Sequence, residues 1–182
     1  TGCPIVTGYT APNLYWLKVN KELSSNFSNI HGTTAPEFVV SRWTGTRPVT
    51  DPTDAVSWGV YDLTKMEWNY NLIDSLGLHQ SLLSDLAESC TPAGTLTTQM
   101  AARLGAKAGI PVSVASGDHQ CSFAGTVTDY ENTLAINIGT GGQASVYVEH
   151  PTPRGWLELR PFIQGGYLLA GFSYSGADGD RS

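Results

Sequence analysis

Apolar residues recur at helical spacing through most of the first 109 residues of the chain. Leu14 and Leu17 fall on one face of a helix, and Thr34 is placed to cap a second helix that Gly45 would end. Helices are therefore predicted over residues 11–20, from near Pro36 to Gly45, and over 69–76, 79–86 and 99–104.

In other segments the apolar residues recur with a period of two, which is typical of strands. Val56 and Val60 alternate with polar or small residues after a polar turn, in which Asp51 and Asp54 are interpreted as turn-forming residues rather than ligands. Strands are predicted over 56–61, 112–115 (buried), 134–138, 144–148 and 167–172, the last one after a hairpin turn at 164–166. Helices dominate up to residue 109 and strands from residue 132, so we expect a domain boundary between residues 110 and 130.

Composition narrows the class of protein without identifying it. The 182 residues carry a formal net charge of −6 and 41% hydrophobic residues, which is typical of a globular chain without a basic face for nucleic acid. No apolar stretch has the length of a membrane span, and the three cysteines and four histidines are widely spaced. We therefore expect a cytoplasmic protein with reduced thiols, no nucleic-acid or membrane partner and no metal site formed by the chain.

The two ends of the chain suggest an internal piece of a longer protein. Thr1 stands where an initiator Met would be expected, and the last seven residues are glycine-rich and polar. We expect further sequence on both sides.

Residues 117–120, Gly-Asp-His-Gln, place a carboxylate directly after an apolar run. Ligands of open α/β sheets bind at strand ends, and a carboxylate there can accept a proton from a substrate hydroxyl. Asp is also a common N-cap of helices, and Asp118 can serve both roles only if one carboxylate oxygen stays free. His119 and Gln120 are either hydrogen-bond partners of a polyol or solvated residues of the first helical turn.

A second glycine-rich segment, residues 137–142, lies between two predicted strands. The simplest interpretation is a hairpin turn, because glycine adopts positive φ without strain. Successive backbone N–H groups in such a turn also form an anion-binding nest, to which Thr140 adds a hydroxyl donor. No Gly-Lys-Ser/Thr follows, so the segment is not a Walker loop. A base and an anion nest together indicate phosphoryl transfer to an alcohol.

Several short stretches of the chain match one known family in their order and approximate spacing: 1–5, 11–17, 50–55, 61–62, 94–96, 104–105, 109–112, 117–118 and 138–141, together with Trp68. Through them the chain resembles the FGGY carbohydrate kinases, whose fold is the actin-like, ribonuclease-H-like α/β fold. The resemblance implies that residues 1–117 are the C-terminal part of the sugar-binding N-terminal domain and residues 118–182 the start of the nucleotide-binding C-terminal domain. The family's Asp-x-Gly-Thr phosphate loop and its adenine site have no counterpart here, so this piece is expected to be inactive alone.

The resemblance also implies a role for each matched position. Asp118 falls on the general base, which deprotonates the sugar hydroxyl as that oxygen attacks the γ-phosphorus of ATP; the implied cofactors are ATP and Mg²⁺. His119 falls on a substrate-contacting position, and Gln120 extends the same site. The phosphate-binding turn falls on Gly139, Thr140 and Gly141.

The substrate is left more open than the reaction. Residues 54–59 and 117–122 look closest to sedoheptulokinase-like members, so a ketose such as sedoheptulose is expected. The alternatives are a xylulose or glycerol kinase of the same family, a non-catalytic sugar-binding paralogue, and an actin-like ATPase. The Asp118 carboxylate is suited to deprotonate a substrate hydroxyl that accepts the phosphoryl group, which argues against an actin-like ATPase. The oligomeric state is open, with a homodimer among the candidates.

Overall fold

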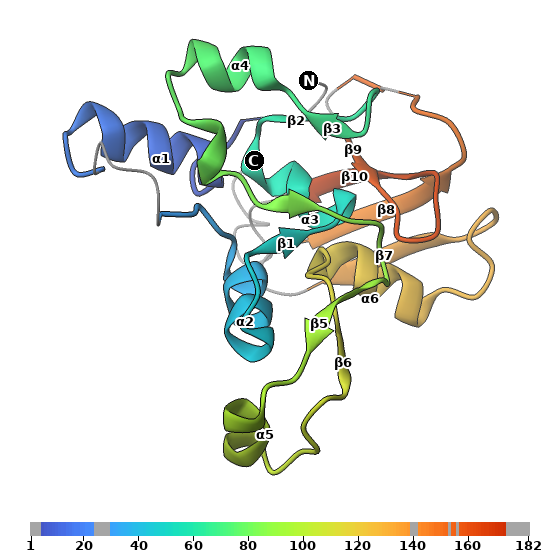
Figure 1. Ribbon diagram of the computed structural model, residues 1–182. Coiled ribbons are helices and arrows are strands. Elements are labelled where there is room, and N and C mark those ends of the chain that lie inside the picture. Colours follow the sequence, from blue (N-terminus) through green and yellow to red (C-terminus); the bar gives the residue numbers. More distant parts are fainter. Residues whose placement is uncertain (1–4, 24–29, 139–141, 153, 156, 174–182) are drawn as a thin grey trace.

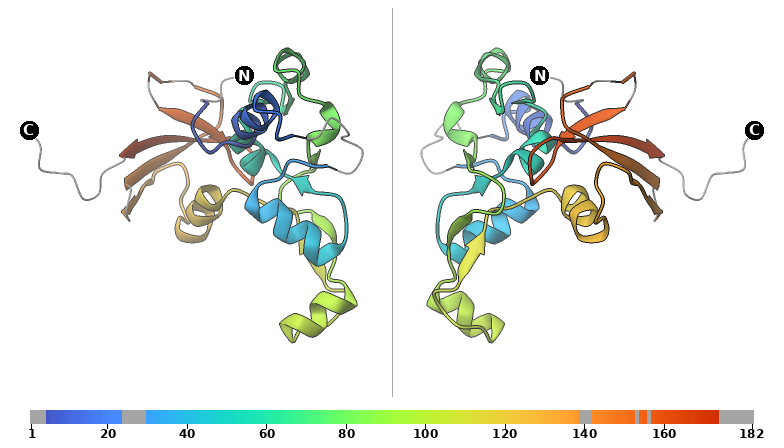
Figure 2. Two further views of the ribbon diagram at one scale, coloured as in Figure 1. Left: turned by 90° about the vertical axis from the view of Figure 1, so that its left-hand side faces the viewer. Right: turned by 90° about the vertical axis from the view of Figure 1, so that its right-hand side faces the viewer.

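The computed structural model describes residues 5–23, 30–138, 142–152, 154–155 and 157–173. An N-terminal part built of helices and two-stranded sheets is followed by helix α6 and a four-stranded antiparallel sheet (Figure 1). Figure 2 shows this sheet on one side of the molecule and helices α1 (Thr10–Val19) and α2 (Ala35–Thr44) toward the other. Within the described ranges, no helix is long and apolar enough to cross a membrane.

Most predicted helices begin and end at the expected local signals. Helix α2 starts at a capping box, in which the Thr34 hydroxyl accepts from the backbone of Glu37 and the Glu37 carboxylate accepts from the backbone of Thr34. It ends at Gly45, whose φ of 71° is left-handed. Helices α1, α4 (Tyr70–Ser75) and α5 (Thr98–Leu104) likewise confirm the predictions for 11–20, 69–76 and 99–104.

Three two-stranded sheets connect these helices. Strand β1 (Val49–Thr50) pairs in parallel with β4 (Asp85–Leu86), and β2 (Tyr61–Asp62) pairs antiparallel with β3 (Glu67–Trp68). Strands β5 (Pro92–Thr95) and β6 (Pro111–Ser113) also pair antiparallel. Together with α5 they form an arm that projects from the rest of the molecule in both figures.

The four-stranded sheet confirms the two predicted hairpins. Its strand order is β7 (Leu134–Ile138), β8 (Gly142–Val148), β10 (Tyr167–Ser173), β9 (Glu158–Pro161), and every neighbouring pair is antiparallel. Helix α6 (Asp118–Thr126) packs on one face through Phe123, which shares a buried cluster with Leu168. Leu169, the next residue of β10, belongs to the other cluster because successive strand residues point to opposite faces.

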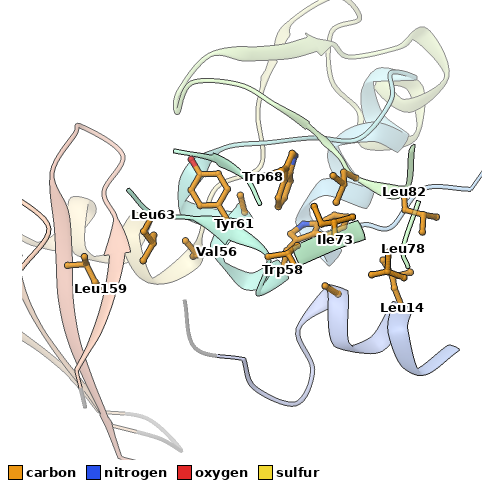
Figure 3. Packing of buried hydrophobic residues seen from close by; sticks show 14 of the residues in the cluster. Leu14, Val56, Trp58, Tyr61, Leu63, Trp68, Ile73, Leu78, Leu82 and Leu159 are labelled. Atoms are coloured by element: carbon orange, nitrogen blue, oxygen red, sulfur yellow. The ribbon is translucent and has the colours of Figure 1, made fainter. Parts of the chain in front are cut away.

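The main core joins the N-terminal part to this sheet (Figure 3). Trp58 and Trp68 are buried at its centre with ring centroids 5.1 Å apart. Leu159 of β9 and Leu169 of β10 belong to the same cluster. The helical part and the sheet therefore stabilise each other through shared apolar burial.

The predicted strand at 56–61 is wrong over most of its length. Asp51 caps the short helix α3 (Pro52–Ala55), which continues as the 3₁₀ turn η1 (Val56–Trp58) and ends at Gly59 with φ 77°. Strand structure begins only at Tyr61. The apolar residues of the alternating pattern are buried all the same: Val56, Trp58 and Val60 enter the core from a coiled backbone instead of a strand.

Two further predictions are also corrected. The predicted helix at 79–86 is a 3₁₀ turn, η2 (Gln80–Leu82), followed by β4, because pairing with β1 satisfies the backbone there. The predicted buried strand at 112–115 is confirmed in part: strand β6 ends at Ser113, and it lies on the projecting arm with Pro111 and Ser113 exposed. Only the following residues, Val114 and Ala115, enter the core.

Candidate active site

Asp118 is the first residue of α6 and lies at an exposed position. The helix N-cap is Gly117, so the prediction that Asp118 itself is the cap is corrected by one position. Its Oδ1 nevertheless accepts a hydrogen bond from the backbone N–H of His119, at 2.7 Å. Among the described residues no hydrogen bond is recorded to Oδ2. The carboxylate is therefore oriented through one oxygen and can accept a proton on the other.

The turn that carries Asp118 is fastened to α3 by Thr53. The Gly117 N–H donates to Thr53 Oγ1 at 2.8 Å, and Gln120 Nε2 donates to the Thr53 carbonyl at 3.1 Å. Thr53 is itself held by Asp51, whose Oδ1 accepts from the Thr53 hydroxyl at 2.6 Å. Asp51 Oδ2 accepts from Ser116 at 2.8 Å. One buried carboxylate thus holds both Thr53 of α3 and the residue before Gly117. The interpretation of Asp51 as a turn-forming residue is confirmed.

Close packing explains why glycine stands at position 117. A Cβ there would lie 2.8 Å from the Thr53 carbonyl oxygen, which is backbone and cannot swing aside. The φ of Gly117 is −64°, so the requirement is for space and not for an unusual backbone conformation. Gly117 thus lets α6 begin directly against α3.

The structure buries the two residues that follow Asp118. Gln120 is 1% exposed and directed to Thr53, and His119 is 8% exposed, with Nε2 lying 2.6 Å from Ser145 Oγ in β8. Burial, aided by the nearby Arg160 guanidinium, lowers the pKa of His119 below its usual value. The predicted sugar contacts of these two side chains stay predictions, and both of their polar ends meet protein groups here.

The predicted phosphate turn at Gly139, Thr140 and Gly141 lies outside the described residues. Its flanks are described: Ile138 at the end of β7 is paired with Gly142 at the start of β8. A cavity of about 230 Å³ lies between α6 and this hairpin. Polar residues from both sides line it, namely His119, Ser122, Thr126, Asn137, Gln143 and Ser145.

A second set of buried carboxylates was not predicted as a unit. Glu37 is fully buried and accepts from Trp58 Nε1 at 3.0 Å and from Ser84 Oγ at 2.8 Å. Asp54, 6% exposed, accepts from Thr34 Oγ1 at 2.6 Å. Burial raises the pKa of Asp54 to about 6, although the hydrogen bonds from Thr34 and Ser57 act to lower it. Thr34 lies 20 residues from Asp54, and Ser84 lies 47 residues from Glu37, so local sequence signals do not bring these groups together.

No group of three or more His, Cys, Asp or Glu side chains is arranged to hold a metal ion in the part of the chain that the structure describes. Cys90 and Cys121 are free and exposed thiols.

Comparison with known proteins places these features in a family. The family described as "FGGY family of carbohydrate kinases, N-terminal domain" matches residues 1–125. Autoinducer-2 kinase of Escherichia coli K12 is 30% identical over 166 residues, which are 87% of this chain and 30% of that protein. Xylulose kinase of Haemophilus influenzae is 27% identical over 160 residues, 86% of this chain and 31% of that protein. The chain thus spans about 30% of the length of these curated relatives.

Solved structures show the same fold. Ligand-bound xylulose kinase from Lactobacillus acidophilus matches 96% of this chain and 36% of its own, with a TM-score of 0.84 and 25% identity. Plasmodium falciparum glycerol kinase with ADP matches 94% of this chain and 36% of its own, with a TM-score of 0.79 and 18% identity, and supports the fold alone. The chain therefore has part of the α/β, actin-like and ribonuclease-H-like kinase fold. It belongs to the FGGY family of carbohydrate kinases.

Proposed function

We propose that this chain is part of an ATP-dependent kinase that phosphorylates a sugar hydroxyl, with Asp118 as the general base. The observation that carries the proposal is the state of the Asp118 carboxylate. It is exposed, one oxygen is fixed by the His119 N–H, and the other receives no recorded hydrogen bond from the described residues. Deprotonation of a sugar hydroxyl requires an oriented base with an oxygen that is open to the proton. The family supplies the class of reaction.

In the proposed reaction, Asp118 accepts the proton of the sugar hydroxyl while that oxygen forms a bond to the γ-phosphorus of ATP. The bond between the γ-phosphorus and the bridging oxygen breaks, and ADP leaves. Gly139, Thr140 and Gly141 would hold the phosphoryl group through backbone N–H groups and the Thr140 hydroxyl. Mg²⁺ is proposed to accompany ATP, where it would offset the negative charge of the phosphates.

The proposed domain division places residues 1–117 at the end of the N-terminal domain and 118–182 at the start of the C-terminal domain. It is supported by α6, which begins at Asp118 and packs on the four-stranded sheet through Phe123. Because the chain spans about 30% of its curated relatives, we propose that activity needs the full-length parent protein. The protein is proposed to be cytoplasmic, with a sugar and ATP as partners, and a homodimer stays a prediction.

For the sugar, we propose a ketose, with sedoheptulose as the first candidate because of residues 54–59 and 117–122. Xylulose is the second candidate, supported by the similarity to xylulose kinases from Haemophilus influenzae and Lactobacillus acidophilus. Both sugars present a primary hydroxyl on a ketose chain, so the same base and phosphate turn would serve either one.

The test is ADP release by the full-length parent protein with sedoheptulose, xylulose or glycerol. Replacement of the base, Asp118→Asn, should lower the sugar-dependent rate about a hundredfold or more. Asp129→Asn, an exposed aspartate beyond the end of α6, is the matched control and should stay close to wild type. Wild-type activity with Asp118→Asn, or no activity of the wild-type parent with any sugar, would refute the proposal. If the wild-type parent binds sugar without turnover, and Asp118→Asn leaves that affinity unchanged, the protein is a non-catalytic binder.

The same assay on the isolated 182 residues tests the proposed extent of the enzyme. We expect no sugar-dependent ADP release. Turnover by this chain alone would show that the missing two thirds of the relatives' length are not needed.

A further inference from the structure

The first turn of α6 is held from two directions. Gly117 and Gln120 bond to Thr53, which lies in the N-terminal part of the chain. His119 contacts Ser145 Oγ, which lies in the sheet that follows α6. The side chain of His119 thus connects the helix to the sheet, as that of Gln120 connects it to α3.

Ser145 is a rigid anchor for this contact. It is 3% exposed and sits in β8, which lies between β7 and β10 in the sheet. In the register it is opposite Ala135 on one side and Ala170 on the other, so its backbone cannot shift without breaking ladder pairing. The same strand starts at Gly142, directly after the predicted phosphate turn.

His119 also contacts Asp118 through its backbone. The N–H of His119 donates to Asp118 Oδ1, whereas its imidazole lies against Ser145. A displacement of His119 would therefore move the donor that orients the Asp118 carboxylate. The edge of the Phe172 ring, with its centroid 6.0 Å from that of the imidazole, limits movement on another side.

We propose that His119 is a positioning residue. Through its contact with Ser145 it sets the place of the Asp118 carboxylate relative to the strand that follows the phosphate turn. The inference rests on the proposed kinase function and gives His119 a role through the protein, in place of the sugar contact implied by the family resemblance.

The surroundings of His119 favour a neutral imidazole. His119 Nδ1 is buried without a hydrogen-bond partner in the described part of the structure, so protonation would add a second buried N–H and a charge. The charged groups around it are Arg160, which disfavours protonation, and Asp118 and Glu158, which favour it. Arg160 and Glu158 pair with each other at 2.8 Å, which offsets part of their effects. Burial, the first cause, keeps the ring neutral at neutral pH.

The experiment uses the full-length parent protein with Ser145→Ala, His119→Phe and the double substitution. Phe retains an aromatic ring beside Phe172 but cannot bond to Ser145. Because displacing a catalytic group by about 1 Å can cost a hundredfold in rate, we expect each single substitution to lower kcat about ten- to a hundredfold. The double substitution should add little, since both remove one contact. KM for the sugar should stay within about threefold, because no substrate contact is removed.

Two further measurements separate positioning from general destabilisation. His119→Gln, whose amide can still bond to Ser145, should recover most of kcat, whereas a loss of sugar contact would not be restored in this way. Hydrogen exchange at the amide of His119 should become about tenfold faster in Ser145→Ala, as expected for loss of one hydrogen bond. Ser75→Ala, the same change at an exposed serine of α4, should alter neither kcat nor this exchange.

The outcomes distinguish this inference from the proposed function. An inactive wild-type parent refutes the kinase proposal before any variant is compared. An active parent in which Ser145→Ala leaves kcat and exchange unchanged refutes only the positioning role. If the His119 variants raise KM while Ser145→Ala is neutral, His119 contacts the sugar directly and the inference is wrong.

Discussion

Asp54 gives the sharpest prediction for the stability of the molecule. The residue is 6% exposed, and Glu37 and Asp51 lie close enough to oppose its ionisation. Burial, the largest cause, raises its pKa from 3.8 to about 6, although hydrogen bonds from Thr34 and Ser57 act in the opposite direction. Each pKa unit corresponds to about 1.4 kcal/mol, so keeping Asp54 ionised costs the folded state about 3 kcal/mol.

The sign follows from proton linkage. Because the pKa is higher in the folded than in the unfolded chain, the protonated carboxyl group favours folding. Its contribution is fully present below pH 3.8 and is lost as the pH rises through about 6. Asp54→Asn removes the ionisation and keeps an oxygen that can accept from Thr34 Oγ1. The variant should therefore be more stable than wild type above this pH range, by up to about 3 kcal/mol.

The assay is urea unfolding of wild type and Asp54→Asn at about pH 4 and about pH 7.5, on either side of the range in which this linkage acts. The difference in unfolding free energy between the two proteins isolates position 54 from the other titrating groups. It should be near zero at the lower pH and favour Asn at the higher pH. Asp85→Asn is the matched control, because the Asp85 side chain is 62% exposed and its pair with Arg47 should contribute less than about 1 kcal/mol.

Two results would refute this reasoning. If Asp54→Asn is less stable than wild type at the higher pH, the hydrogen bond from Thr34 outweighs the cost of burying the charge. If the difference between the proteins is the same at both pH values, Asp54 does not titrate in this range.

Two further substitutions test the packing around the candidate site. Gly117→Ala should destabilise the chain by about 2 kcal/mol and abolish activity of the parent, because the new methyl group would collide with the Thr53 carbonyl; thermal unfolding and ADP release measure both. Gly125→Ala on the same helix, where a Cβ meets nothing within 4 Å, should instead stabilise by about 0.5–1 kcal/mol. Glu37→Gln should cost about 2 kcal/mol in urea unfolding, because the amide nitrogen takes the place of one carboxylate oxygen and cannot accept the hydrogen bonds that Trp58, or Ser84 and the Thr34 backbone, give to that oxygen. Stability equal to wild type would show that these buried donors find other acceptors.

Local signals in the sequence were sufficient to predict several helices and strands. Thr34 and Gly45 mark the two ends of α2 because capping depends on residues within one turn of the helix. The alternation after Thr133 predicts β7 and β8, since strand neighbours joined by a short turn need no distant partner to set their register. The candidate base was also found in this way, as a carboxylate next to a glycine after an apolar run.

Contacts with distant segments accompany the failed predictions at 79–86 and 56–61. Residues 79–86 carry a helical pattern, yet Asp85 and Leu86 pair with Val49 and Thr50. Residues 56–61 alternate as a strand does, yet the Asp51 cap starts a coiled segment that carries Trp58 to Glu37. In both segments a tertiary contact outweighed a weak local preference.

The sequence by itself therefore determined the helices with strong caps and the two hairpins, and it predicted Asp118 as the candidate base. Only the tertiary structure decided how that base is held, with Thr53 on one side of its turn and Ser145 on the other. It also decided that Asp54 has a pKa of about 6. The physical reason is that capping and alternation act between near neighbours, whereas burial and side-chain hydrogen bonds depend on which distant segments the fold brings together.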